Sequence, residues 1–473
     1  MQTECIERTF VFQPLDRRDV VGKFDGGTIT SDAGALLLRE VDRGTSIIQK
    51  FAACFTDFRN PDLIEHELTG LIAQRVYGLA LGYEDLNDHD ELRKDPLLAT
   101  LAGKADPTGQ NREQKRDRGK PLAGKSTLNR LELTPEGANR KSRYKKIVIR
   151  PEAVDDFLVD VFIAAHREPP KPLILDFDAT DDPLHGEQED RFFHGYYREY
   201  CYLPLYAFCE GFPLCAKLRP SNIDASKGTV EELKRIVPRL REAWPEVEII
   251  VRGDSGFCRE EIMAWCEENK VEYVFGIAKN KRLKDEIAEE LEDAKKQYEQ
   301  TGKASRVYKD FRYRTRKTWT RERRVVGKAE HLSKGENPRF VITSLPCEEI
   351  AASELYEKLY CARGDMENRI KEQQLDLFAD RTSTTEFRGN QVRLYFSTVA
   401  YVLLHILRRV GLQGTDLEKA QCGTIRLKLL KIGAQVRVTF RKVWISMATG
   451  YPYIDLFAEV YRKLRALTPL PAS

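Results

Sequence analysis

The chain has 473 residues, of which 41% are hydrophobic and 32% are charged, and its formal net charge is +3. A chain of this length can bury a sizeable core and divide into two or more domains, and so small a net charge does not by itself indicate a nucleic-acid binder. No run of about 18 apolar residues is present and the start, residues 1–5, lacks a signal-peptide pattern, so we expect a cytoplasmic protein of bacterial type with no membrane partner.

Residues 1–105 predict a mainly helical N-terminal domain. An alternating segment at 9–12 indicates a short strand, and Ser31 or Asp32 precedes an Ala- and Leu-rich helix that extends to about residue 43. A second helix is expected at 62–81, where apolar residues recur every three or four positions. Residues 106–150 are polar, Gly-rich and basic, and we interpret them as a linker that either contacts phosphates or is a solvated loop.

Residues 151–280 predict the first part of an α/β core. Short apolar runs and periodic segments indicate, in order, strands at 173–177, 202–209 and 214–218, a helix at 229–243, a strand at 247–251, a helix at 259–269 and a strand at 273–277. Three strands in a meander, followed by alternating helices and strands, suggest a mixed sheet with helices on both faces.

Residues 281–346 interrupt this plan with a charged helix and alternating segments at 307–313, 319–326 and 339–344, which we interpret as a β-rich insertion domain. Basic residues interleaved with aromatic ones suit a phosphate backbone and exposed bases. The candidate contacts are Arg316, Lys317, Trp319 and Arg321. Trp319 could stack on an unpaired base, although a tryptophan in a strand more often belongs to a core.

The core resumes at residues 347–400 with a helix expected at 351–374, and residues 401–473 predict a helical C-terminal region. That region contains the basic residues Arg426, Lys428, Lys431, Arg437, Arg441 and Lys442.

Two strands run into acidic residues. The first carries Asp176, Asp178, Asp181 and Asp182 at its end, and crowded carboxylates repel one another unless a divalent cation supplies the opposite charge. The second ends at Asp254 between two glycines, and neighbouring strands of an α/β sheet bring such ends together. An acidic turn and a helix N-cap are the alternatives.

A third polar pattern lies on the helix expected at 351–374. Tyr360, Arg363, Glu367, Lys371 and Gln374 recur at intervals of three or four residues and therefore share one helix face. An ion-paired surface stripe is the alternative interpretation.

Together these segments resemble the catalytic set of ribonuclease H-like nucleases and transposases. Asp178-Ala179-Thr180 is similar to the Asp-x-Thr of insertion-sequence DDE transposases, and the third pattern is similar to their Tyr-x2-Arg-x3-Glu-x6-Lys signature, except that Gln374 stands at the final lysine position. The runs at 178–186, 193–197 and 252–257 resemble those of the DDE group 1 transposases, insertion sequence family thirteen-eighty. This resemblance covers nearly the whole chain.

The resemblance implies a ribonuclease H-like mixed sheet with helices on both faces, a β-rich insertion domain, a helical N-terminal DNA-binding domain and a helical C-terminal region. It implies a DNA transposase in which Asp178, Asp254 and Glu367 hold two Mg²⁺ ions, with Mn²⁺ as a substitute. The strands are cut by phosphodiester hydrolysis, and the 3′-hydroxyl ends are joined to target DNA.

Further residues follow from the resemblance. Tyr360, Arg363 and Lys371 would contact DNA, and Asp176 is a rival to Asp178, because strand alternation places both on one face. The supporting residues are Thr180, Asp181, His185 and His194, for which contacts to DNA or to the ligands are favoured over Mg²⁺ ligation by histidine.

The implied partners are double-stranded DNA, as terminal inverted repeats and as target, and a second copy of the chain in a homodimer on DNA. Repeat recognition would belong to the N-terminal domain and the basic C-terminal stretch. The alternatives are a ribonuclease H-like nuclease without strand transfer and a catalytically silent, domesticated DNA-binding protein.

Overall fold

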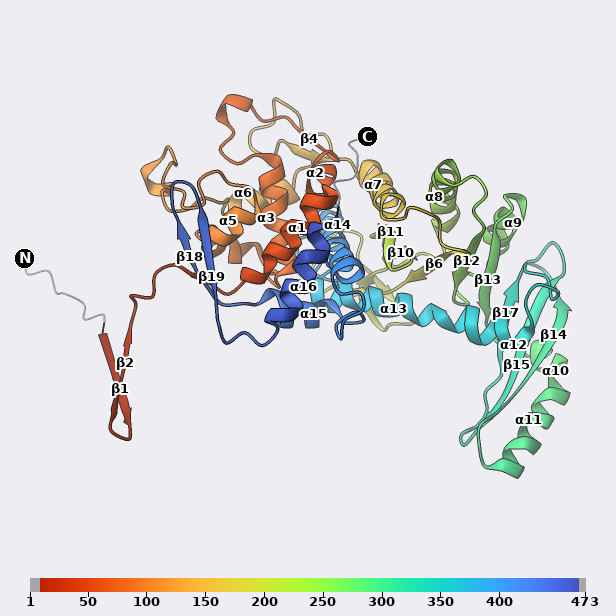
Figure 1. Cartoon of the computed structure of the whole chain (residues 1–473). Coiled ribbons are helices and arrows are strands. Elements are labelled where there is room, and N and C mark those ends of the chain that lie inside the picture. Colours follow the sequence, from red (N-terminus) through yellow and green to blue (C-terminus); the bar gives the residue numbers. More distant parts are fainter. Residues whose placement is uncertain (1–8, 468–473) are drawn as a thin grey trace, which may run out of the picture. The chain divides into compact units, whose positions relative to one another are not determined.

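The computed structural model describes residues 9–467, so the start at residues 1–5 lies outside the described residues. The chain forms two compact units, which Figure 1 shows coloured along the sequence. Unit 1 comprises Met1–Ala52, Arg59–Leu131 and Ile406–Ser473, and unit 2 comprises Ala53–Phe58 and Glu132–His405. The N-terminal and C-terminal regions, which we expected as separate parts at 1–105 and 401–473, thus belong to one unit.

Unit 1 is mainly helical, as the sequence predicts. The helix expected at 62–81 is α3 (Leu68–Ala80), and the one expected up to residue 43 is α1 (Leu36–Thr45). The other helices of this unit are η1 (Ala33–Ala35), α2 (Ile47–Ala52), η2 (Pro61–Leu63), η3 (Leu86–Asp88), α4 (His89–Leu92), α5 (Pro96–Leu101), η4 (Lys115–Asp117), α6 (Lys125–Glu132, whose last residue is assigned to unit 2), η8 (Leu407–Gly411), α15 (Cys422–Ile425), η9 (Arg426–Leu430) and α16 (Ile454–Arg465). The region 106–150, expected as a linker, contains η4, α6 and the strand β5 (Ile147–Ile149).

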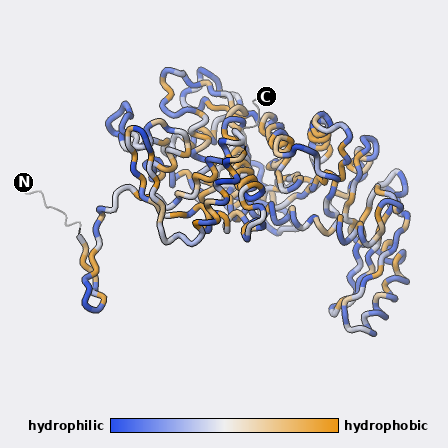
Figure 2. The backbone as a smooth tube through the Cα atoms, in the orientation of Figure 1, coloured by the Kyte–Doolittle hydropathy of each residue, from blue (hydrophilic) through white to orange (hydrophobic). Residues whose placement is uncertain are grey.

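Two small β structures belong to unit 1. Strand β18 (Ala434–Val438) pairs with β19 (Val443–Met447) and with the short β3 (Ile29–Thr30), so the C-terminal segment is joined to the N-terminal one. Strands β1 (Thr9–Leu15) and β2 (Arg18–Lys23) form a hairpin whose residues are almost all exposed, although Figure 2 shows apolar positions along it. Between residues 9 and 467, no helix is long and apolar enough to cross a membrane.

The centre of unit 2 is a mixed sheet of nine strands with the order β11-β10-β6-β12-β13-β17-β15-β14, in which β16 pairs with β15. Strands β6, β12 and β13 are parallel, and the other pairs are antiparallel. The strands are β6 (Leu173–Ala179), β10 (Leu205–Cys209), β11 (Phe212–Lys217), β12 (Ile249–Gly253), β13 (Glu272–Ile277), β14 (Ser305–Tyr313), β15 (Arg323–Leu332), β16 (Gly335–Glu336) and β17 (Arg339–Thr343). The smaller sheets contain β4 (Phe55–Asp57) with β5 (Ile147–Ile149), and β7 (Asp182–Pro183), β9 (Glu199–Tyr202) and β8 (Phe192–His194).

Helices cover both faces of this sheet (Figure 1), as expected for the ribonuclease H-like fold. The order of β6, β10, β11, α8 (Thr229–Ala243), β12, α9 (Glu260–Glu268) and β13 is the one that the sequence predicts. The remaining helices are α7 (Pro151–Ala164), α10 (Lys281–Glu286), α11 (Ala288–Thr301), α12 (Ala352–Glu354), η5 (Leu355–Tyr360), η6 (Cys361–Arg363), α13 (Gly364–Lys371), η7 (Glu372–Asp376) and α14 (Phe387–Ile406).

The segment 281–346 does not form a sheet of its own. Strand β17 pairs with β13 on one side and with β15 on the other, so the expected β-rich insertion extends the central sheet. The physical reason is that β13 would otherwise be an edge strand with unpaired backbone N–H and C=O groups. Pairing with β17 provides hydrogen-bond partners for these groups. The contacting side chains of Val326, Val341 and Val274 are fully buried in one core cluster.

Strand alternation fixes which side chains share a sheet face. Ile174 and Ile250 pack in the same cluster as Leu355 and Tyr356 of η5, so the helical segment that begins at α12 covers this face. Asp176 and Asp178 follow Ile174 by two and four positions, and Asp254 follows Ile250 by four, so they lie on the same face. The acids of both strands therefore point toward the segment that carries Glu367.

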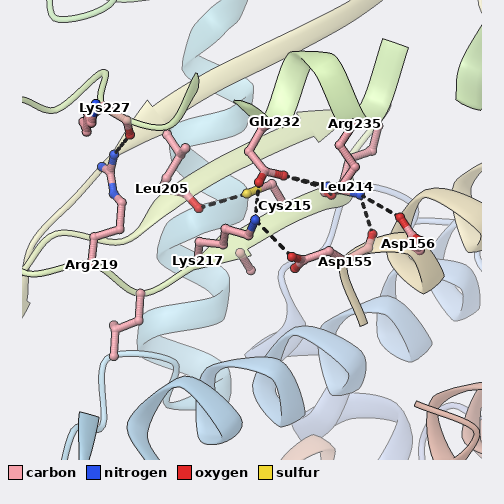
Figure 3. Close-up of polar contacts among 12 residues, drawn as sticks. Asp155, Asp156, Leu205, Leu214, Cys215, Lys217, Arg219, Lys227, Glu232 and Arg235 are labelled. Carbon is pink, nitrogen blue, oxygen red and sulfur yellow. Dashed lines mark hydrogen bonds and ion pairs between the residues drawn. The ribbon is translucent and has the colours of Figure 1, made fainter. Parts of the chain in front are cut away.

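A network of buried charges holds α7, β11 and α8 together (Figure 3). Lys217 on β11 forms ion pairs with Asp155 and Glu232, and Arg235 binds Glu232 at 2.6 Å. Arg235 also donates to the backbone oxygens of Asp155 and Leu214, at 2.7 and 2.8 Å. These contacts fix one edge of the central sheet to the helices beside it.

Candidate active site

The ends of two parallel strands bring the first two acids to one level of the sheet. In the β6–β12 register, Phe177 lies opposite Gly253, so Asp178 and Asp254 are the next residues on neighbouring strands. Asp178 is half-buried at the end of β6, and its Oδ1 accepts a hydrogen bond from the Ala179 amide at 2.9 Å.

Asp254 sits in a tight turn directly after β12. Its Oδ1 accepts a hydrogen bond from the Gly256 amide at 2.8 Å. A Cβ atom at Gly256 would lie 2.9 Å from this same oxygen, and one at Gly253 would lie 3.0 Å from the Phe257 side chain. The two glycines are thus required for the close packing of the turn that holds Asp254.

Arg363 joins the third acid to the first. Its guanidinium lies 3.2 Å from Oδ2 of Asp178 and 2.6 Å from Oε1 of Glu367, which is one helical turn further along. Glu367 is on α13, and its side chain is 42% exposed, compared with 16% for Asp178. The segment that covers the sheet therefore brings Glu367 to the strand ends.

The electrostatics of Asp178 show that the three acids influence one another. Burial, the largest cause, raises its pKa to about 7 together with the charges of Asp254 and Glu367, while Arg363 opposes this shift. Tyr360, also on this segment, has a pKa raised by burial, so its phenol remains a neutral hydrogen-bond donor at physiological pH.

The two aspartates of β6 have different surroundings. Asp176 is buried, and its two carboxylate oxygens accept hydrogen bonds from Nε and Nη2 of Arg252, at 2.5 and 2.7 Å. Arg252, which is directly opposite Asp176 in the sheet, also donates to the backbone oxygen of Leu359. Asp176 is thus occupied by an ion pair inside the fold, whereas Asp178 faces Asp254 and Glu367.

The chemistry of the donor set fits a divalent metal. Three carboxylates provide the hard oxygen ligands that Mg²⁺ and Mn²⁺ prefer, and a cation would offset both the burial and the neighbouring acids that raise the pKa of Asp178. Across residues 9–467, no three His, Cys, Asp or Glu side chains converge closely enough to ligate one ion. Instead, the Arg363 guanidinium lies between Asp178 and Glu367.

Gln374, at the place of the signature lysine, has a contact of its own. Its Nε2 donates to the Asp181 backbone oxygen at 3.0 Å and to Oδ1 of Asp182 at 2.9 Å. Burial raises the pKa of Asp182 to about 8, and its Oδ2 is buried with no hydrogen-bond partner. A neutral amide thus faces a carboxyl group that burial keeps protonated. Lys371 is exposed, one turn beyond Glu367.

The supporting residues lie around the end of β6. Thr180 contacts Asp181 at 3.5 Å, and a hydrogen bond with Asp181 raises the pKa of the half-buried Glu199. His185 is exposed, and His194 packs against Tyr197 with ring centroids 4.9 Å apart.

The basic residues of the β14–β15 hairpin have mixed surroundings. Arg316 and Lys317 are exposed, and Arg321 forms an ion pair with Glu267. Trp319 is only 8% exposed and packs edge-on against Tyr313. Its ring therefore packs in a small core, and its stacking on an unpaired base stays a prediction.

Sequence reasoning missed several residues beside the acids. Arg252 inside the apolar strand 249–253 was an available signal, because a buried arginine requires an anionic partner. Gly276, Lys279 and Arg339 carry no local pattern, because only the pairing of β13 with β17 brings them together.

Acids at the ends of two neighbouring strands, with a third on the helical segment that covers them, are the arrangement expected of DDE transposases with a ribonuclease H-like core. The chain matches the family model of the transposase DDE domain, group 1, over residues 12–469, and it belongs to that family. Among solved structures it is similar to piggyBac transposase in a synaptic complex with hairpin DNA, with 10% identity, a TM-score of 0.40, and coverage of 85% of this chain and 80% of that chain. No curated protein matches the sequence.

Proposed function

We propose that this protein is a cut-and-paste DNA transposase that binds the terminal inverted repeats of an insertion sequence, cleaves the strands and joins the 3′-hydroxyl ends to target DNA. The observation that carries the proposal is that Asp178 and Asp254 follow neighbouring strands while Arg363 binds both Asp178 and Glu367. Membership of the transposase DDE family supplies the class of reaction.

The three carboxylates would hold two Mg²⁺ ions, which would activate water or a 3′-hydroxyl and stabilise the leaving oxygen. Displacement at phosphorus is in line and leaves little covalent chemistry to the protein, so the side chains mainly position the strand and balance its charge. In this structure Arg363 binds two carboxylates, and its planar guanidinium would bind a DNA phosphate equally well. The exposed Lys371 would contact the backbone on the same helix face.

Unit 1 would recognise the ends of the element. The β18–β19 hairpin exposes Arg437, Arg441 and Lys442, which suit a phosphate backbone. Lys431, by contrast, forms an ion pair with Asp32 at 2.7 Å and has a structural role. Because two ends must be cut and joined together, we infer a homodimer on DNA.

The test is joining of a pre-cut, labelled 3′-end of the flanking element to a target plasmid in Mg²⁺ or Mn²⁺. We expect joining by the wild type and none by Glu367→Ala. Asp365→Ala is the matched control, because Asp365 is an exposed acid on the same helix that pairs with Arg369. Cleavage without any joining would show a nuclease, and DNA binding with neither step would show a silent binding protein.

A further inference from the structure

A pocket of about 410 Å³ lies beside Asp254, at the carboxyl ends of β12 and β13. Its volume is within the range of about 300 to 1,000 Å³ that is usual for small-molecule sites. Its lining includes Ser255 from the turn after β12, Gly276 and Lys279 from the end of β13, and Arg339 from β17. None of these residues belongs to the three acids or to the signature of the Glu367 helix.

The pocket shares a wall with the candidate catalytic turn. A Cβ atom at Gly276 would lie 2.5 Å from the Tyr360 hydroxyl, 3.1 Å from the Ser255 amide nitrogen and 3.4 Å from the carbonyl carbon of Asp254. The Tyr360 hydroxyl therefore lies over Gly276 and next to the backbone of the turn. A ligand in the pocket would be the immediate neighbour of a group held by Asp254.

Two cations at this pocket have no acidic partner. In the part of the chain that the structure describes, neither Lys279 nor Arg339 has a carboxylate within 4.0 Å. The three cations of the adjacent strand β15 are all paired: Arg323 with Glu260 and Glu267, Arg324 with Asp310, and Lys328 with Glu330. The cations of β15 are buried and need these partners, whereas Lys279 and Arg339 are exposed, so their charges are available to an anion from outside the chain.

The rest of the lining indicates what kind of anion this is. Ile277, Pro338 and Phe340 supply apolar surface, and Tyr356 and Tyr360 supply aromatic groups. A flat, partly apolar group that carries a phosphate matches this combination, and in DNA that group is a nucleotide. The base would have to be unpaired, because a base inside a duplex is stacked on both faces and cannot enter a pocket.

We infer that this pocket binds one unpaired nucleotide of the DNA strand next to the scissile phosphate, with its phosphate on Arg339 and Lys279 and its base against the apolar and tyrosine side. The inference rests on the proposed function, because it takes the substrate to be DNA. The two residues position the strand and do not touch the reacting phosphorus.

The test is equilibrium binding of a short, unstructured, fluorescein-labelled oligothymidylate, measured by anisotropy in EDTA at several salt concentrations. For Arg339→Ala and Lys279→Ala we expect several-fold weaker binding, and the slope of log affinity against log salt should fall by about 0.7 for each cation removed. Lys334→Ala is the matched control, because Lys334 is an exposed lysine on the neighbouring β15–β16 turn.

A second variant separates the pocket from its charge. Ala278 is an exposed residue of the lining, and Ala278→Trp should fill the pocket while both cations remain. We expect this variant to weaken oligothymidylate binding and to leave binding of a blunt duplex unchanged.

The inference is overturned if Arg339→Ala and Lys279→Ala bind as the Lys334→Ala control does, or if Ala278→Trp binds the oligothymidylate like the wild type. In the second case the two cations would act on an open surface. Because these measurements need no cleavage, a failure here is distinct from a failure of the proposed function, which only the Mg²⁺-dependent assays test.

Discussion

The aspartates of β6 illustrate how neighbouring residues on one strand face have different roles. Strand alternation places Asp176 and Asp178 on the same face, so the sequence could not decide between them. In the sheet, Arg252 lies opposite Asp176 and binds both of its oxygens, so we propose Asp178 as the acid that acts with Asp254 and Glu367.

This difference predicts opposite effects of two equivalent substitutions on stability. Asp176→Asn leaves the buried Arg252 without its charged partner and should lower the free energy of unfolding by about 3 kcal/mol. Asp178→Asn should leave stability equal or higher, because burial and two neighbouring acids oppose the charge of Asp178. Urea unfolding of both variants measures this, and equal destabilisation would contradict the assignment.

Asp182 predicts a dependence of stability on pH. Its pKa is raised by burial to about 8, from 3.8, so between about pH 4 and pH 8 the folded protein keeps a proton that the unfolded chain releases. The contribution of Asp182 to the free energy of unfolding therefore falls as the pH rises through this range.

Asp182→Asn should remove this part of the pH dependence while keeping the acceptor for Gln374. We expect the free energy of unfolding of the variant, relative to that of the wild type, to increase by about 1 to 3 kcal/mol from pH 5 to pH 8. Urea unfolding at the two pH values, with Asp181→Asn as the control, provides the measurement. Parallel pH profiles of the variant and the wild type would show that Asp182 is ionised in the folded protein.

Secondary-structure elements were predictable from local patterns, but their partners were not. Helix α8 has the bounds that the sequence predicts, and β14 and β17 lie within two residues of theirs, whereas β15 extends to Leu332, beyond the expected end at residue 326. The local sequence of these strands does not show that β17 pairs with β13. The two strands are far apart in the sequence, and their pairing depends on the tertiary structure. The pocket beside Asp254 was missed for the same reason.

The charged network among α7, β11 and α8 predicts a measurable coupling between elements. Glu232→Ala leaves Lys217 and Arg235 without their shared partner and should cost about 3 to 5 kcal/mol of unfolding free energy. Lys217→Met combined with Glu232→Ala should cost less than the sum of the two single substitutions, because each single one leaves one partner of the Lys217–Glu232 ion pair unmatched. Chemical denaturation of the single and double variants gives the coupling energy, and simple additivity would show that the pair does not interact.

At the scale of the whole molecule, the chain forms two units that do not follow the sequence order. Pairing of β3 with β18 and the ion pair of Lys431 with Asp32 join the two ends of the chain in unit 1, while the three acids all belong to unit 2. The motifs of the acids were visible in the sequence because chemistry restricts residue types. The joining of the ends was not visible, because it depends on tertiary contacts between ordinary helices and strands.

The central claim is that Asp178, Asp254 and Glu367 form a single metal-dependent site that cuts DNA. The most direct test is cleavage of a labelled duplex that carries the flanking element's end, in Mg²⁺ or Mn²⁺, by Asp178→Ala, Asp254→Ala and Glu367→Ala, with Asp365→Ala as the control. We expect the three variants to bind the duplex without cutting it, while the control cuts like the wild type. Normal cutting by Asp178→Ala would contradict the account, and so would cutting by the wild type in EDTA.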